Sequence, residues 1–484
     1  MSEGKITEVF NKGLSEVIGT MKKMSNDIKE RDAKIEKLEA ELRRLEKQKS
    51  KNSSNSSKPP SSDGLNKKTK SLRKKSNKKP GGQKGHEGIT LELSPNPDEV
   101  KVQRVDKCIK CGASLVFLKS ESYEIRQQID ALESKLKIIE YRAEIKTCPK
   151  CGHKNKGEFP EGIDNTVQYG EKIKALAVYF SKHQMIPYDR LSDILQVIYG
   201  QRISKGSLVN FNKLCYGNLE SIEYNIKQKL LESDVIHCDE TGIKVNGKLQ
   251  WTHVVSNENY TFLKVHKKRG QEAINEIDIL PNYENIAVHD FWKSYDSYTN
   301  CIHAACGAHI LRELVAITEL EKQKWAKPVY DLLMRIKESV DMSKQHANST
   351  LSGDELQNYS LEYDRLVSKG VSEDFKINNI KYSERKNAKK STSLNLLNRL
   401  ILFKDRVLAF MYDFRIPFTN NQAERDLRML KVSQKISGTY RSDFGAECSM
   451  RINGYISTLK KNSHNILKCL ESVFTSCKFD PTLA

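Results

Sequence analysis

The sequence lacks any long apolar run, which excludes the usual membrane-spanning helix. Among its 484 residues no stretch reaches about 18 consecutive apolar residues. The N-terminus also lacks the basic segment and apolar core of a signal peptide. We therefore expect a cytoplasmic protein without a membrane partner.

Acidic residues are in short supply relative to basic ones. The chain has 62 Asp and Glu against 81 Lys and Arg, a formal net charge of +19, and a sequence pI of about 9.2. Such an excess is typical of nucleic-acid-binding proteins, although some basic proteins have no polyanionic partner. The 11 cysteines favour thiols and metal ligands over a disulfide framework, because the chain is large and shows no secretion signal.

Residues 1–50 are predicted to form a coiled-coil helix and residues 51–95 a basic disordered linker. The heptad core positions are Phe10, Leu14, Val17, Met21, Met24, Ile28, Ile35, Leu38, Leu42 and Leu45. This pattern favours a homodimer or higher oligomer, with a solvated helix that packs on its own chain as the alternative. The lysine-rich linker suits binding to phosphate backbones, or serves only to increase solubility.

Residues 96–160 are predicted to form a small zinc-binding domain. Two Cys-x-x-Cys pairs supply the predicted Zn²⁺ ligands, Cys108, Cys111, Cys148 and Cys151. Each such turn aims two thiolates at one point, which fits tetrahedral zinc. His153 is a less favoured alternative ligand, and residues 123–129 and 136–144 are expected to be strands.

Residues 161–230 are predicted to be a helical DNA-binding domain. A first predicted helix with an apolar stripe is followed by a second helix that begins at Pro187. A turn at Gly200 then leads to a third helix, which begins with polar residues at about Ser204. This order is typical of a helix-turn-helix, although generic helical packing gives the same pattern.

The C-terminal half is predicted to be a mixed α/β catalytic domain over residues 231–445. Short apolar runs indicate strands at residues 235–238, 251–255, 260–265, 286–288 and 301–305. Long connections between them favour some parallel pairing. A helical insertion is expected at about residues 320–400, and a helical tail at 446–484, so the whole chain is a multidomain α+β protein.

Three acidic residues far apart in the sequence are candidate ligands of a divalent metal. Asp239 and Asp290 follow short apolar runs, and Glu424 lies in the first turn of a predicted helix. Carboxylates are the ligands that Mg²⁺ prefers, and two such ions can activate phosphodiester chemistry. The same residues also suit turns and helix starts, and Glu240 and Asp234 are competing ligands.

Basic residues near these acids are candidates for orienting DNA or the metal ligands. They are His309, Arg312, Arg425, Arg428, Lys431 and Lys435. Surface ion pairs are the alternative for the last four. Cys306 and His309 have the spacing of a zinc half-site, but no second pair is evident nearby.

Several motifs, in order along nearly the whole chain, resemble bacterial DDE transposases of the insertion-sequence sixty-six (IS66) type. Besides the N-terminal heptads and the paired cysteines, they comprise residues 57–63 (SKPPSSD), 81–88 (GGQKGHEG), 237–241 (HCDET), 289–290 (HD), 306–313 (CxxHxxRE), 417–425 (PFTNNQAER), 435–438 (KISG) and 444–446 (FGA). Any one of these motifs is weak, but their order is specific.

The resemblance implies an RNase H-like catalytic domain with Asp239, Asp290 and Glu424 as the metal-binding triad. It implies Mg²⁺, which Mn²⁺ can replace, and double-stranded DNA partners, namely terminal inverted repeats and target DNA. It also implies a nucleoid-associated bacterial enzyme that cuts the ends of its element and joins the 3′-hydroxyls to target DNA, with accessory proteins in related elements. The rival interpretations are a zinc-containing dimeric DNA-binding regulator without catalysis, and an RNase H-like nuclease that cuts without joining.

Overall fold

The computed structural model describes residues 3–11, 13–53, 55–56, 93–129, 136–382 and 391–483. The chain forms two compact units: the larger comprises Met1–Lys70, Pro160–Ser192 and Ile203–Ala484, and the smaller comprises Ser71–Phe159 and Asp193–Arg202. Most of the predicted basic linker, residues 57–92, lies outside the described residues. Within the described ranges no helix is long and apolar enough to cross a membrane.

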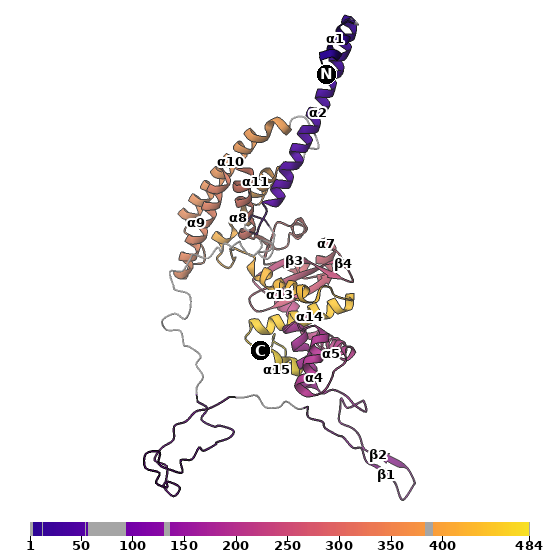
Figure 1. Ribbon diagram of the computed structural model, residues 1–484, viewed down its shortest axis with the longest axis vertical. Helices are drawn as coiled ribbons and strands as arrows, with labels where there is room; N and C mark the ends of the chain where they lie inside the picture. Colours follow the sequence, from indigo (N-terminus) through magenta and orange to yellow (C-terminus); the bar gives the residue numbers. More distant parts are fainter. Residues whose placement is uncertain are drawn as a thin grey trace. The chain divides into compact units, whose positions relative to one another are not determined.

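The larger unit contains a five-stranded mixed sheet (Figure 1). Its strands are β3 (Val235–Val245), β4 (Lys248–Ser256), β5 (Thr261–His266), β6 (Ile286–His289) and β7 (Ile302–Ala305). They lie in the order β5-β4-β3-β6-β7. Strands β3, β4 and β5 pair antiparallel, whereas β6 and β7 join in parallel. The predicted mixture of parallel and antiparallel pairing is confirmed.

Strand β3 is longer than the apolar pattern predicted. It continues to Val245, where Asn246 and Gly247 form a tight turn with φ angles of 49° and 73°. Such left-handed turns match the twist of a β-hairpin, and β4 then pairs with β3 along most of its length. Strand β4 supplies hydrogen-bond partners for the backbone of the polar second half of β3. Asp239 therefore lies inside the strand. The prediction that it ends a strand was wrong.

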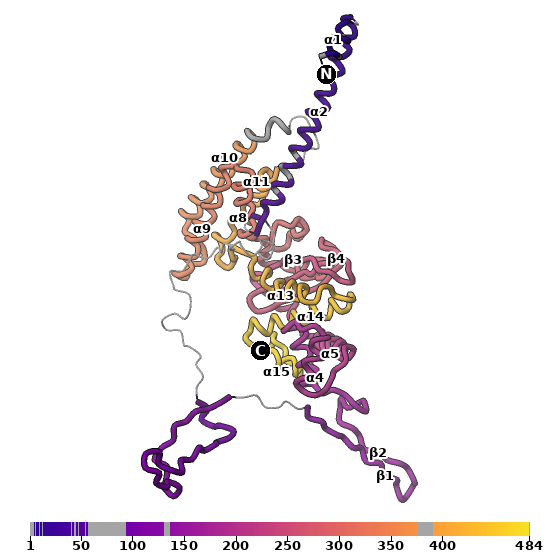
Figure 2. Tube along the Cα trace, viewed as in Figure 1, coloured from indigo at the N-terminus to yellow at the C-terminus, as the bar shows by residue number. Residues whose placement is uncertain are grey.

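The two faces of β3 carry different side chains, because side chains alternate along a strand. Asp239, Ile243 and Val245 share one face, called here the Asp239 face. Ile243 and Val245 pack in one cluster with apolar residues of α13 (Asn421–Ser437) and α14 (Asp443–Lys461). Helix α13 therefore covers the Asp239 face, and its contact with β3 is visible in Figure 2.

The chain between β7 and α13 is helical, as predicted for about residues 320–400. The helices are α8 (Gly307–Ala316), π-helix η5 (Ile317–Glu321), α9 (Ala326–Gln345), α10 (Gly353–Tyr382), α11 (Thr392–Leu402) and α12 (Lys404–Tyr412). Their apolar side chains form one core with Ile286 and Val288 of β6. Within it Trp325 is buried and donates to Gln323 Oε1 at 2.6 Å, so its polar atom is satisfied. This core fixes α8 beside the sheet.

The predicted helices of residues 161–230 are present. They are α3 (Glu171–Val178), π-helix η2 (Tyr179–His183), α4 (Tyr188–Tyr199), α5 (Lys205–Asn218) and α6 (Glu220–Leu231). Gly200 has a φ of 70° after α4. The Ser204 side chain caps α5 by accepting from the backbone N–H of Ser207 at 3.0 Å.

The two ends of the chain differ from the predicted domain limits. The N-terminal heptads form two helices, α1 (Glu3–Asn11) and α2 (Leu14–Lys49), because Gly13 adopts a φ of 101° between them. The expectation of one helix is therefore corrected. At the other end, α14 crosses the predicted limit at residue 446 and packs on the sheet, and α15 (Ile466–Val473) packs on α3.

Candidate active site

Asp239 and Asp290 lie on neighbouring parallel strands. The β3–β6 register pairs Val235 with Ile286 and His237 with Val288. Extended by two residues, the same register pairs Asp239 with Asp290, which directly follows β6. Neighbouring strands are about 4.8 Å apart, and paired residues point to the same face. The sheet therefore places both residues on the Asp239 face, although among the described residues the oxygens of Asp239, Asp290 and Glu424 do not form a group that lies within 4.8 Å of one another.

Asn420 ties the start of α13 to this place. Its Nδ2 donates to the carbonyl of Cys238 at 2.8 Å, and its Oδ1 lies 2.8 Å from His237 Nδ1. Its backbone N–H donates to Cys306 Sγ at 3.1 Å. Asn420 is buried and thus joins β3, α8 and α13 beside Asp239. This role of Asn420 was not predicted from the sequence, although the residue belongs to the 417–425 motif.

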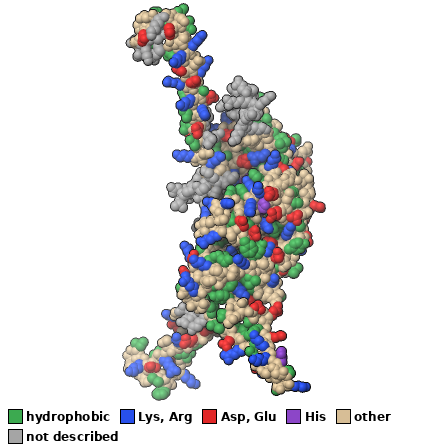
Figure 3. All heavy atoms as spheres, turned by 90° about the vertical axis from the view of Figure 1, so that its right-hand side faces the viewer, with side chains coloured by type: hydrophobic (Ala, Val, Ile, Leu, Met, Phe, Trp, Pro, Cys, Tyr) green, Lys and Arg blue, Asp and Glu red, His purple; other side chains and the backbone are tan. Residues whose placement is uncertain are grey.

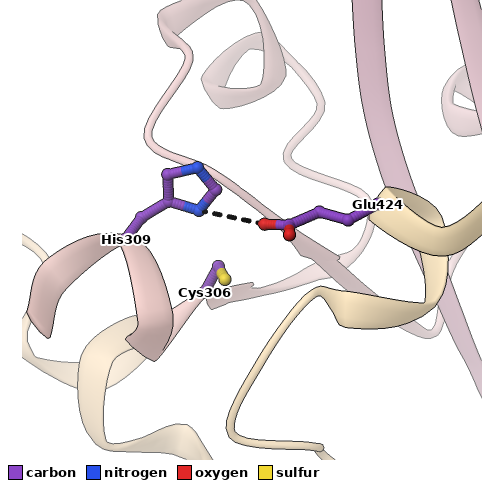
Figure 4. A group of neighbouring side chains, drawn as sticks. All are labelled: Cys306, His309 and Glu424. Atoms are coloured by element: carbon purple, nitrogen blue, oxygen red, sulfur yellow. Dashed lines mark ion pairs between the residues drawn. The ribbon is translucent and has the colours of Figure 1, made fainter. Parts of the chain in front are cut away.

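Glu424 extends from the first turn of α13, as predicted. Its Oε1 accepts from Arg312 Nη2 at 3.2 Å and lies 3.9 Å from His309 Nδ1. Figure 4 shows the carboxylate pointing toward the imidazole. Ala423 and Leu427 are buried on the inner side of this helix, as their helical spacing in the sequence favours.

The electrostatics of the site favour a bound cation. Burial, and then the nearby Glu240 carboxylate, raise the pKa of Asp239 to about 8, with Asp290 and Glu424 adding to the effect. Burial and Glu240 also raise the pKa of Asp290 to about 6. Carboxylates that repel one another in a desolvated place gain free energy when a divalent cation binds between them.

Glu240 and Asp234, the competing ligands, are otherwise placed. Glu240 lies on the opposite face of β3 from Asp239. Arg269 Nε donates to its Oε1 at 2.8 Å, and the Tyr295 hydroxyl donates to its Oε2 at 2.7 Å. Asp234 precedes β3, has an exposed side chain and lies 3.8 Å from a guanidinium nitrogen of Arg415. Glu240 therefore affects the two aspartates through its charge while its oxygens bind Arg269 and Tyr295, and Asp234 remains exposed.

The predicted basic residues fall into two sets. Arg312 and His309 adjoin Glu424. The others lie along α13, where Arg425 donates to the Gln422 side chain and Lys431 to the Gly242 carbonyl. Two more, Arg428 and Lys435, have exposed side chains.

Glu313 turns away from Glu424. It pairs with Arg399 of α11, whose Nη1 lies 3.0 Å from Glu313 Oε1.

The paired cysteines of the smaller unit form two turns of the same design. Gly112 and Gly152, each with a φ of 74°, follow the second cysteine of each pair. Their backbone N–H groups donate to the carbonyls of Cys108 and Cys148, both at 2.9 Å. Backbone hydrogen bonds within the turns lower the pKa of the Cys108 and Cys148 thiols. Thiols of lowered pKa suit a metal such as zinc.

The four thiols do not form one group in the described structure, where the only cluster with metal-binding geometry lies elsewhere. The strands expected at residues 123–129 and 136–144 are also wrong, since both ranges are irregular. Instead β1 (Ile145–Thr147) and β2 (Lys154–Lys156) flank the second turn. The expected strands have exposed apolar side chains, such as Ile138 at 92% exposure, and no core to pack against.

Comparison with known families identifies the family to which the chain belongs. A family model described as Transposase IS66 family matches residues 166–448, more than half of the chain. The chain therefore belongs to the IS66 transposase family, and the resemblance that its motifs indicated is confirmed. A second model, described as Family of unknown function (DUF6444), matches residues 14–92. No curated protein matches the chain.

Proposed function

We propose that the protein is a DNA transposase whose Asp239, Asp290 and Glu424 hold the catalytic metal. The observation that supports the proposal is the β3–β6 register, which would align two aspartates 51 positions apart (290 − 239) if it continued two residues beyond its last pair. Asn420 then holds the helix of Glu424 against the same strand. Membership of a transposase family supports the function itself.

The site fits Mg²⁺, with Mn²⁺ as a substitute, because its donors are carboxylate oxygens in a buried place. When bound, the metal supplies charge that stabilises the attacking and leaving oxygens of a phosphodiester. Asp239 and Asp290 would be the central ligands and Glu424 the outer one. Burial and the neighbouring carboxylates raise the pKa of Asp239 to about 8, and a bound cation would favour its ionised form. Arg312, which contacts Glu424, would offer donors to adjoining phosphates.

The proposed reaction is in-line displacement at phosphorus. Water attacks the end of the element and frees a 3′-hydroxyl, which then attacks target DNA in the same site. A sheet with three antiparallel strands followed by two parallel ones supports the proposal of an RNase H-like domain. It is a scaffold in which central strands present carboxylates on one face.

The other parts of the chain are proposed to bind DNA and to pair subunits. The helices α4 and α5 would bind the terminal inverted repeats together with a zinc-bound form of the four cysteines. Figure 3 shows basic side chains mixed with acidic ones on the face drawn, so no broad basic patch marks a docking site there. The exposed apolar residues of α2 would pair two chains so that two DNA ends meet. Accessory proteins of the same element are further candidate partners.

One reaction separates the proposed function from its rivals. The protein is incubated with Mg²⁺, target DNA and DNA that carries the inverted repeats flanking its gene. We expect cut ends followed by joined products. Cut ends without joining would indicate a nuclease, and a mobility shift without any cut would indicate a regulator.

A further inference from the structure

A group of three potential metal ligands lies beside the proposed magnesium site. One ligand atom each from Cys306, His309 and Glu424 lies within 4.8 Å of the others (Figure 4). Cys306 directly precedes α8, and His309 lies in its first turn. The sequence showed no further metal ligand near the Cys-x-x-His pair. In the folded chain Glu424 of α13 supplies a third ligand.

The chemistry of this group differs from that of the two aspartates. Thiolate and imidazole ligands favour Zn²⁺, whereas Mg²⁺ prefers sites made entirely of oxygen. The Cys306 side chain is fully buried, and its Sγ accepts the backbone N–H of Asn420 at 3.1 Å. Burial raises the pKa of the Cys306 thiol to about 11, and the hydrogen bond from Asn420 only partly offsets this effect. The thiolate therefore needs a bound cation, which displaces the proton.

The imidazole is free to act as a ligand. His309 Nδ1 is buried, and within the described ranges it has no hydrogen-bond partner. A buried polar atom without a partner costs free energy, which a bound metal would recover. The positive charge of Arg312 lies nearby and would disfavour a bound cation, since its guanidinium donates to Glu424 Oε1 at 3.2 Å. The carboxylate has a second oxygen with which to bind a metal.

We propose that Cys306, His309 and Glu424 bind Zn²⁺ and that this zinc inhibits the enzyme. Three protein ligands leave a fourth coordination position open, as is common for zinc. Zinc would hold Glu424 toward α8 and place two positive charges next to the magnesium site, which disfavours magnesium binding there. The zinc site stands on its own geometry, whereas its inhibitory effect rests on the proposed function.

The first test counts zinc in the full-length protein. The wild-type chain, Cys306→Ser and the control Cys215→Ser are saturated with Zn²⁺, freed of excess metal and subjected to elemental analysis. Cys215 is a matched control, because both thiols have no exposed surface. The four cysteines of the smaller unit contribute equally to all three proteins, so their zinc cancels.

We expect Cys306→Ser to hold one zinc ion fewer per chain than the other two proteins. With Co²⁺ in place of Zn²⁺, its thiolate-to-metal absorption should also be weaker. His309→Gln, which changes a partly exposed side chain, repeats the comparison should the serine variant fail to fold. Equal zinc content and equal absorption across the set would overturn the proposal.

The second test measures inhibition. Zinc is added at increasing concentration to the magnesium-dependent cutting of end-repeat DNA, with each variant compared to its own rate without zinc. For His309→Gln the zinc concentration needed for inhibition should rise by more than about 100-fold. Loss of a residue that only hydrogen-bonds to a metal ligand typically costs roughly 10- to 100-fold, and the loss of a ligand itself should cost more. Equal sensitivity of this variant and the wild type would overturn the inhibitory role. Absence of cutting by the wild type without zinc would instead contradict the proposed function, and the zinc count would still decide for the site.

Discussion

The two regions that carry predicted metal ligands are built in opposite ways. Asp239 lies in a strand of a sheet with a packed core, and Asp290 directly follows the neighbouring strand, so the packed sheet positions both residues. The paired cysteines belong to a segment with exposed apolar side chains, such as Phe117 at 98% exposure. Its regular structure in the described residues is limited to β1 and β2. Packing thus positions the first set of residues, whereas we expect a bound cation to bring the second set together.

The largest expected effect is the loss of zinc from the four cysteines. For small zinc domains the free energy of metal binding is folding free energy, roughly 10–16 kcal/mol at pH 7. A chelator, or Cys108→Ser, should therefore make residues 93–159 sensitive to limited proteolysis while the sheet stays resistant. Cys477→Ser, which removes an exposed thiol elsewhere, is the control. A cleavage pattern that does not change on chelation would remove zinc from this region.

Next in size is the effect of Asp239→Asn on catalysis. The bound metal supplies several kcal/mol of transition-state stabilisation, so cutting and joining should both fall by about 1,000-fold or more. DNA binding, measured by mobility shift, should persist. Asp234→Asn, at an exposed position before the same strand, should keep full activity. Normal joining by Asp239→Asn would show that this carboxylate does not hold the metal.

A third effect is a pH-dependent loss of stability in the metal-free protein. The folded-state pKa of Asp239 is about 8, above the value of about 3.9 for an unfolded chain. The folded state therefore binds the proton more tightly, and its stability falls as pH rises from about 4 to about 8. At about 1.4 kcal/mol per pKa unit, the loss reaches a few kcal/mol.

Urea unfolding in a chelator at several pH values measures this loss. Mg²⁺ should restore stability at the alkaline end, and Asp239→Asn should flatten the pH profile. Equal profiles for the wild type and Asp239→Asn would contradict the assignment of the effect to this residue.

A smaller effect is expected from Asn420→Ala. The change leaves buried partners on β3 without their hydrogen bonds, at a cost of about 1–3 kcal/mol for each one left unsatisfied. It should lower both the free energy of unfolding and the turnover rate, while the affinity for DNA stays the same. Asn421→Ala, at the exposed neighbouring position, is the matched control. If both variants cut DNA at the same rate, the link between β3 and α13 does not position Glu424.

The smallest effect belongs to Arg428→Ala on the exposed side of α13. A contact with phosphate adds affinity without sequence preference, so binding should weaken equally for all DNA sequences. The slope of log affinity against log salt should become shallower by about 1. An unchanged slope would mean that Arg428 does not touch DNA.

The sequence alone predicted the positions of the five strands of the large sheet and of the helix that carries Glu424. These depend on local patterns of apolar residues, and Ala423 and Leu427 are buried as that pattern required. The full length of β3 was not predictable from such patterns, because its polar half owes its structure to pairing with β4. The orientation of Glu240 follows only once that longer strand is known.

Contacts between distant segments were beyond the sequence. The side chain of Asn420 forms hydrogen bonds with two residues of β3 that lie 182 and 183 positions away in the sequence. Cys306 and Glu424, 118 positions apart (424 − 306), meet only because α8 and α13 are both fixed against the sheet. The motif 417–425 marked this region as important but did not say which of its side chains reaches which partner.

The most direct test is a crystal structure of the protein with Mn²⁺ and end-repeat DNA, in which anomalous scattering locates the ions. We predict a manganese ion bound by carboxylate oxygens of Asp239 and Asp290, at distances near the roughly 2.0–2.1 Å that Mg²⁺ requires, with Glu424 at the same centre. Ions bound elsewhere on the DNA-bound protein, with these three carboxylates unligated, would contradict the proposed catalytic site.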